Sequence, residues 1–101
     1  MASANSKRRL PVYVGERYLP GRSADHAMAE ADRIRAAAAH LARQGSTVRL
    51  LSTTFVPEEE WMFDLFEADA SSEIERIYAR ARVAVGRISS AIHMPDQGGR
   101  R

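Results

Sequence analysis

Three histidines, His26, His40 and His93, are the side chains best suited to chemistry in a chain of 101 residues that has no cysteine. Histidine is the common general base near neutral pH and a common nitrogen ligand of metal ions. His26 and His40 are 14 residues apart in one predicted helix, a separation of about 21 Å, so one ion cannot bind both. Any metal site is therefore expected to draw on Asp25, His26, His40 and His93 and to be completed across a dimer.

A second candidate for chemistry is Asp64, a carboxylate between aromatic residues of a predicted strand. If it is buried it needs a partner, and Arg17, Arg87 and His93 are the candidates. The candidate catalytic residues are Asp64, His93 and Arg17, with His93 or Asp64 as base and Arg17 stabilising an oxyanion. The chain has no glycine-rich phosphate loop, no Gly-x-Ser-x-Gly motif and no dinucleotide fingerprint.

The formal net charge of +2 is unevenly placed along the chain. Residues 1–9 carry three basic side chains and no acid, and residues 95–101 carry two basic and one acidic, which leaves residues 10–94 at −2. We expect disordered tails at 1–9 and 95–101 around one domain at 10–94, and no nucleic-acid partner. No apolar run reaches the roughly 18 residues of a membrane span, so we expect a cytoplasmic protein without a membrane partner.

Hydrophobic periodicity predicts six elements within residues 10–94. Residues rich in β-branched and aromatic types predict strands at 10–19, 48–56, 61–68 and 87–94. Apolar residues at helical spacing predict one helix at 24–44, with Ser23 as N-cap and Gly45 after its end, and a shorter one at a Ser72–Glu75 capping box. Gly15 inside the first strand indicates a bulge or a close backbone approach.

The order β-α-β-β-α-β is that of the ferredoxin-like α+β fold, a four-stranded antiparallel sheet with two helices on one face. Placing Val12, Val14, Leu50, Phe63, Leu65, Ile88 and Ile92 under the helices leaves an open face of mixed polarity. That open face would contain Tyr13, Leu51, Thr53, Phe55, Met62, Asp64, Phe66, Ser89, Ala91 and His93. A ligand cleft is predicted at Tyr13, Thr53, Phe55, Met62 and Phe66, enclosed when two sheets face each other in a dimeric α+β-barrel assembly.

Four segments, at 16–21, 52–59, 63–68 and 86–88, resemble a family of short, mostly actinobacterial proteins of largely unknown function. The family is described as nickel-binding after one Streptomyces member. The resemblance implies a ferredoxin-like subunit that dimerises and binds a divalent metal, with Ni²⁺ as the expected cofactor. Many relatives carry a histidine in or just after the second helix, whereas residues 77–86 of this chain contain none.

Two functions of different classes follow from these patterns, and whether the chain is an enzyme stays open. The first is a small cytoplasmic homodimer, paired through its open sheet face, that binds a divalent metal or a small ligand. The alternative is a cofactor-free oxygenase, isomerase or cyclase that acts on a small aromatic or polyketide-like substrate.

Overall fold

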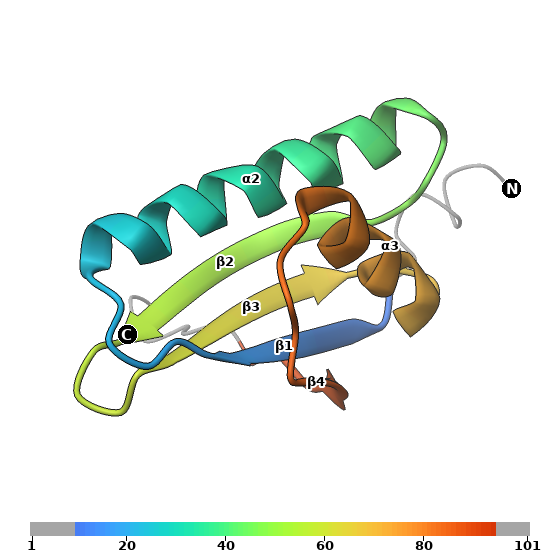
Figure 1. Cartoon of the computed structure of the whole chain (residues 1–101). Coiled ribbons are helices and arrows are strands. Elements are labelled where there is room, and N and C mark those ends of the chain that lie inside the picture. The colour runs from blue at the N-terminus through green and yellow to red at the C-terminus, as the bar shows by residue number, and fades with distance from the viewer. Residues whose placement is uncertain (1–9, 95–101) are drawn as a thin grey trace, which may run out of the picture.

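A computed structural model describes residues 10–94 and shows the predicted order of strands and helices (Figure 1). The elements are β1 (Val12–Tyr18), α2 (Ala24–Arg43), β2 (Arg49–Val56), β3 (Trp61–Glu67), α3 (Ser71–Ala81) and β4 (Arg87–Ala91). This confirms the ferredoxin-like α+β class. The predicted tails at 1–9 and 95–101 lie outside the described residues.

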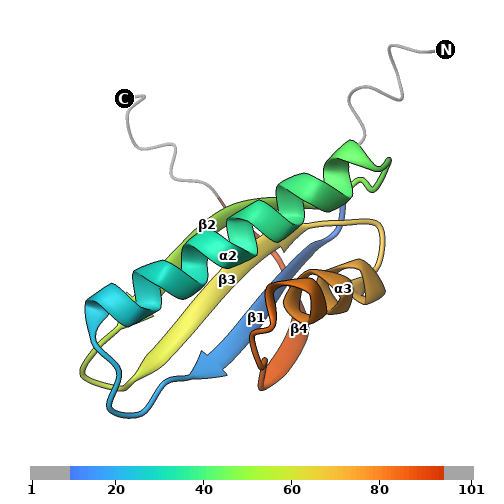
Figure 2. The same ribbon diagram turned by 45° about the horizontal axis from the view of Figure 1, so that its top comes forward.

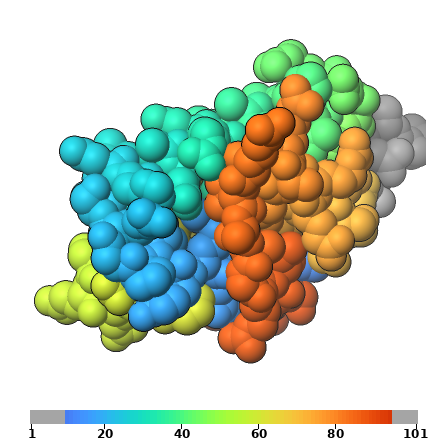
Figure 3. All heavy atoms as spheres, viewed as in Figure 1, coloured from blue at the N-terminus to red at the C-terminus, as the bar shows by residue number. Residues whose placement is uncertain are grey.

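The four strands form one antiparallel sheet in the order β2-β3-β1-β4. Both helices lie on the same face of this sheet, so the structure has two layers (Figures 1 and 2). After α3 the chain passes beside α2 and over β1 to reach β4, as the space-filling view shows (Figure 3). The face away from the helices is called the open face below.

The long helix α2 begins and ends as the sequence predicts. The backbone N–H of His26 donates to the Ser23 side chain, which caps the helix, and Gly45 beyond its end has a φ of 102°. Its buried stripe is made of Ala27, Ala31, Ile34, Ala37, Ala38 and Leu41. Four of these six residues are alanines, and their small side chains allow this helix to pack closely on the sheet.

Two predicted element ends need correction, and the other ends differ from the prediction by at most two residues. The helix α3 begins at Ser71 after an extended Ala70, without a side-chain cap, so Ser72 already lies inside the helix and cannot act in a capping box. The strand β4 ends at Ala91 rather than at residue 94. Ala91 pairs with Val12, and the next residue outward in that neighbouring chain segment is Pro11, which has no N–H to continue the ladder.

The predicted assignment of β1 and β3 to the two faces is inverted. Met62, Asp64 and Phe66 of β3 are 2%, 0% and 0% exposed and face the helices. The register places the following residues on this side as well: Tyr13, Arg17, Thr53 and Phe55. The open face instead carries Val12, Val14, Phe63 and Leu65, which were expected under the helices. Strand alternation separates two faces without stating which one the helices cover, and a shift of one residue exchanges them.

The glycine in β1 provides a close approach. A Cβ at Gly15 would lie 2.0 Å from the Tyr78 hydroxyl oxygen of α3, far inside van der Waals contact. The one register shift in the sheet lies instead in β2, between Leu50 and Ser52. Gly15 therefore fulfils the second of its two predicted roles, since it makes room for the tyrosine hydroxyl above the sheet.

We predict that Gly15→Ala destabilises the protein by about 1–3 kcal/mol, as an overpacked core does. Denaturant unfolding followed by circular dichroism would measure the loss. In a Tyr78→Phe background, which lacks the hydroxyl oxygen, the same substitution should cost less. Equal costs in the two backgrounds would show that the hydroxyl does not set the need for glycine.

Candidate functional site

A buried ion pair joins the two central strands beneath the helices. The Arg17 Nε donates to Asp64 Oδ2 at 2.8 Å, and its Nη2 donates to Oδ1 at 3.4 Å. The side chains are 2% and 0% exposed. β1 and β3 are neighbours, with Gly15 paired to Asp64, so the carboxylate and the guanidinium two residues further along β1 lie on the same face of the sheet.

The pair is part of a longer chain of hydrogen bonds that reaches both helices. The Tyr78 hydroxyl of α3 donates to Asp64 Oδ2 at 2.6 Å, and Arg17 Nη1 donates to Glu30 of α2. His26 Nε2 lies 3.0 Å from the other oxygen of Glu30, with 39% of the histidine side chain exposed. The chain of hydrogen bonds thus runs from the surface at α2 to the core at α3. Glu30 and Tyr78 are members that no pattern in the sequence reveals.

The electrostatics of this network favour a charged Arg17 and a protonated Tyr78. Burial lowers the pKa of Arg17, but the hydrogen bond and charge of Asp64 and the charge of Glu30 outweigh it and raise that pKa. Burial, together with the charge and hydrogen bond of Asp64, raises the pKa of the Tyr78 phenol far above its usual value. Tyr78 therefore stays protonated and donates, and no buried side-chain N or O atom in residues 10–94 lacks a partner.

Of the three predicted catalytic residues, the structure brings together Arg17 and Asp64 but not His93. Asp64 is fully buried, whereas Arg17 and Glu30 border a small hollow of about 160 Å³. Asp64 is thus held by Arg17 and Tyr78 away from solvent, and loss of either partner would leave a buried polar group without its bond. A catalytic role for Asp64 stays a prediction.

A row of aromatic side chains crosses the open face. The ring centroids of Trp61 and Phe63 lie 6.5 Å apart in stacked orientation, and those of Tyr18 and Trp61 lie 5.3 Å apart. By register, Val14 and Leu65 lie on the same face at the centre of the sheet. Trp61, Phe63, Val14 and Leu65 are all half-buried in the single chain. Because Val14, Phe63 and Leu65 are predicted under the helices, this apolar surface on the open face is not expected from the sequence.

A hollow of about 280 Å³ lies at one end of the open face. It is lined by Leu10, Pro11, Val12, Leu51, Glu67, Ala91, Ile92 and His93. His93 therefore borders the open side, as expected, although Asp64 lies on the other side of the sheet. The acid that lines the same hollow as His93 is Glu67.

The predicted metal ligands do not come together. Asp25 and His26 lie in the first turn of α2, His40 lies near its last turn, and His93 lies beyond β4. His26 is already bonded to Glu30. Within residues 10–94 no group of three or more His, Cys, Asp or Glu side chains could hold a metal ion. The described residues of one chain thus form no complete nickel site, and a site completed across a dimer stays a prediction.

Comparison of the chain with protein-family models, with curated proteins and with solved structures finds no match. The order of the elements agrees with the resemblance described above, and nickel binding has no support from these comparisons. No helix in residues 10–94 combines the length and the apolar character needed to cross a membrane. The cytoplasmic location stays a prediction.

The high pKa of Tyr78 predicts a loss of stability in alkali. Above the ordinary tyrosine pKa of about 10, the unfolded chain releases this proton and the folded chain keeps it. Stability should be fully present below pH 10 and fall by about 1.4 kcal/mol per pH unit above it. Urea unfolding between pH 9 and 11 would measure the slope. In Tyr78→Phe, the free energy of unfolding should fall less steeply with pH, by about 1.4 kcal/mol per pH unit. An unchanged slope would show that Tyr78 is not the group responsible.

We also predict that Asp64→Ala costs about 3–5 kcal/mol, because it leaves the Arg17 charge in the core with one acceptor fewer. Asp32→Ala, which breaks the exposed pair of Asp32 with Arg35, is the matched control and should cost at most about 1 kcal/mol. Thermal unfolding of both variants compares the two pairs. Similar losses would mean that burial does not set the cost of breaking the pair.

Proposed function

We propose that the protein is a homodimer that binds a small ligand, with the open faces of two copies packed on each other. The observation that carries the proposal is the row of half-buried apolar side chains at Trp61, Phe63 and Leu65 on the face that no helix covers. Exposed apolar patches of several hundred Å² on a small protein are typical of an interface or a ligand groove.

The size of the face supports a second sheet as its occupant. Four strands of about seven residues give a projected area of about 450 Å², and the relief of the side chains adds to it. A stable interface buries about 800 Å² on each partner. Nearly the whole face must therefore be covered at once. A flat sheet of equal size satisfies this requirement, and face-to-face packing of two sheets is a common arrangement.

The charges around the open face also suit a second copy. They form two pairs, Glu16 with Arg87 at 3.3 Å and Arg49 with Glu67 at 3.1 Å. Each pair joins side chains that the register places on the open face. These charged groups balance, so an identical face meets no net repulsion.

The hollow beside His93 supports the ligand part of the proposal. Six of its eight lining residues are apolar, and Glu67 and His93 add one acid and one imidazole. Its volume of about 280 Å³ lies just below the usual range for small-molecule sites, about 300–1,000 Å³. The ligand that fits is a small, mostly apolar molecule with one polar group that bonds to Glu67 or His93. A second sheet laid over the hollow would enclose it.

The enzymatic alternative receives less support from the same geometry. It needs a base and an oxyanion partner in one cleft. His93 borders the open face, whereas Arg17 and Asp64 lie under the helices and bind each other. We therefore propose binding rather than catalysis as the function of this face.

Light scattering after gel filtration tests the dimer. The full chain should have twice its mass of 11.2 kDa. Thr54 is exposed on the open face beside Phe63, so Thr54→Glu should leave the fold intact and yield monomers. Met28→Glu is the control, because it places the same charge at a 64% exposed apolar residue of α2 and should leave the dimer intact.

The single tryptophan of the chain, Trp61, gives a second readout. Its emission should shift to longer wavelength when the dimer is diluted and in Thr54→Glu, because the indole then meets water. A wild-type monomer at high protein concentration would overturn the proposal. So would a dimer that Thr54→Glu leaves intact while Met28→Glu disrupts it.

A further inference from the structure

The arginines of residues 10–94 are distributed unequally between the two layers. Ten arginines lie in this part of the chain, and four of them, Arg17, Arg35, Arg49 and Arg87, form ion pairs. Five others, Arg33, Arg43, Arg76, Arg80 and Arg82, gather between α2 and α3. None of these five forms an ion pair with a described residue. The space between α2 and α3 therefore holds positive charge that is not paired with a carboxylate of the described residues, although residues 10–94 have a net charge of −2.

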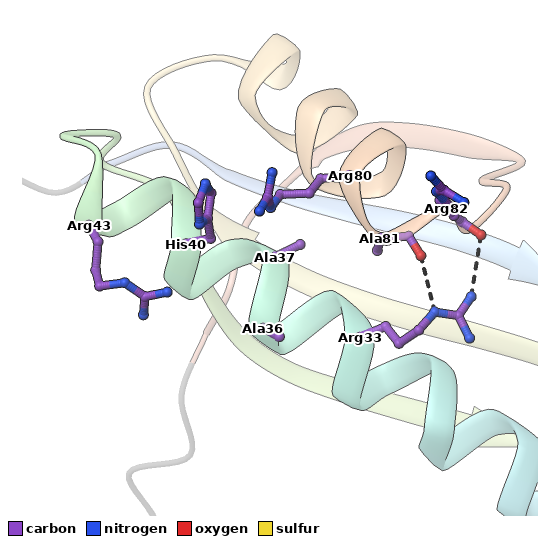
Figure 4. A pocket seen from close by; sticks show the side chains of 8 residues that line it. All are labelled: Arg33, Ala36, Ala37, His40, Arg43, Arg80, Ala81 and Arg82. Atoms are coloured by element: carbon purple, nitrogen blue, oxygen red, sulfur yellow. Dashed lines mark hydrogen bonds between the residues drawn. The ribbon is translucent and has the colours of Figure 1, made fainter.

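These five arginines and His40 line two adjoining hollows, which we call the arginine groove. The larger one has a volume of about 560 Å³ and is lined also by Ala36, Ala37 and Ala81. The second, of about 510 Å³, shares His40, Arg80 and Arg82 with the first. No aspartate or glutamate lines either hollow. In Figure 4, Arg33 of α2 reaches toward the end of α3 and Arg80 of α3 points into the space between the helices, whereas Arg43 points away from α3.

Part of the groove is fixed in position before any ligand binds. Arg33 Nε donates to the Ala81 carbonyl at 3.1 Å, and its Nη2 donates to the Arg82 carbonyl at 3.3 Å (Figure 4). These bonds tie the guanidinium of α2 to the end of α3. They also leave N–H groups of Arg33 free to donate to a ligand, because a guanidinium has five donors.

The positive charges of the groove disfavour protonation of the His40 imidazole. Burial, together with the charges of Arg80 and Arg43, lowers the pKa of His40. The charged groups that act on His40 from α3 and from its own helix are therefore both positive. An anion placed here would offset that repulsion.

We propose that the arginine groove binds a small ligand that carries two or more phosphate groups, such as an inorganic oligophosphate or a nucleoside triphosphate. Arginine forks match phosphate oxygens in bidentate geometry. From Arg33 to Arg43 the groove follows about 15 Å of α2, more than one phosphate group occupies. The larger volume lies within the range of small-molecule sites.

Single-stranded nucleic acid fits the groove less well. Successive bases need a series of aromatic side chains on which to stack, and the described residues that line the two hollows include one such ring, that of His40, among alanine, leucine and glutamine. The groove lies on the helix layer, away from the open face, so pairing of two sheets leaves it accessible. Its test is thus independent of the proposed dimer.

Calorimetric titration of the full chain with sodium tripolyphosphate, at about 0.15 M salt, tests the proposal. One ligand should bind per chain, and the paired substitution Arg76→Gln with Arg80→Gln should weaken binding about tenfold or more. The matched control, Arg22→Gln with Arg35→Gln, removes the same charge outside the groove and should have little effect. No binding, or equal weakening by both pairs, would overturn the proposal.

Two further measurements distinguish the possible ligands. Adenosine triphosphate that binds more tightly than tripolyphosphate would indicate that the alanine floor contacts the nucleoside, and equal affinity would indicate recognition of phosphates alone. By NMR, bound tripolyphosphate should raise the pKa of His40. Binding that leaves His40 unchanged, or binding of single-stranded RNA without any binding of oligophosphate, would contradict the proposal.

Discussion

A guanidinium and a carboxylate lie buried between the sheet and its helices. Every polar atom of this pair needs a partner, because each unpaired group in the core costs several kcal/mol. Arg17 and Asp64 meet this requirement with one group from each helix, Glu30 from α2 and Tyr78 from α3. The ion pair of the central strands is thus bonded to both helices. It sets the position of α2 and α3 over the sheet in a way that apolar contacts alone, which lack direction, would not.

The same interaction determines which side of the sheet remains open. Since Asp64 faces the helices, its neighbours in β3 at positions 63 and 65 must face away from them. The surface proposed to pair with a second copy is therefore a consequence of the buried ion pair. The need for glycine at position 15 is a further consequence. The Tyr78 hydroxyl reaches Asp64 through the space that a side chain at this position would fill.

The sequence predicts the order of the elements well and the content of the faces poorly. The caps at Ser23 and Gly45 and the periodicities of 2 and 3.6 are local signals, and the structure confirms them. The facing of β3 depends on a partner 47 residues away in the chain, and periodicity carries no such information. The apolar residues at 63 and 65 suggested a core, whereas Asp64 between them is the buried residue. A pairing of Gly15 with Asp64 would have revealed this, but strand register is not visible in one sequence.

The two layers also use their charges in opposite ways. On the sheet, each described arginine that belongs to a strand is paired with a carboxylate, so none of these three positive charges lacks an acid beside it. Between the helices, five arginines have no such partner in the described residues and repel one another. Positive charge gathered without compensation lowers stability, and a bound polyanion would relieve it. Net charge summed along residues 10–94 conceals this difference, because an excess of acids elsewhere, such as the three glutamates at 58–60, outweighs the groove. In a dimer joined through the open faces, each copy would therefore present its arginine groove outward, and the apolar and the anionic ligand would occupy opposite layers of the same small domain.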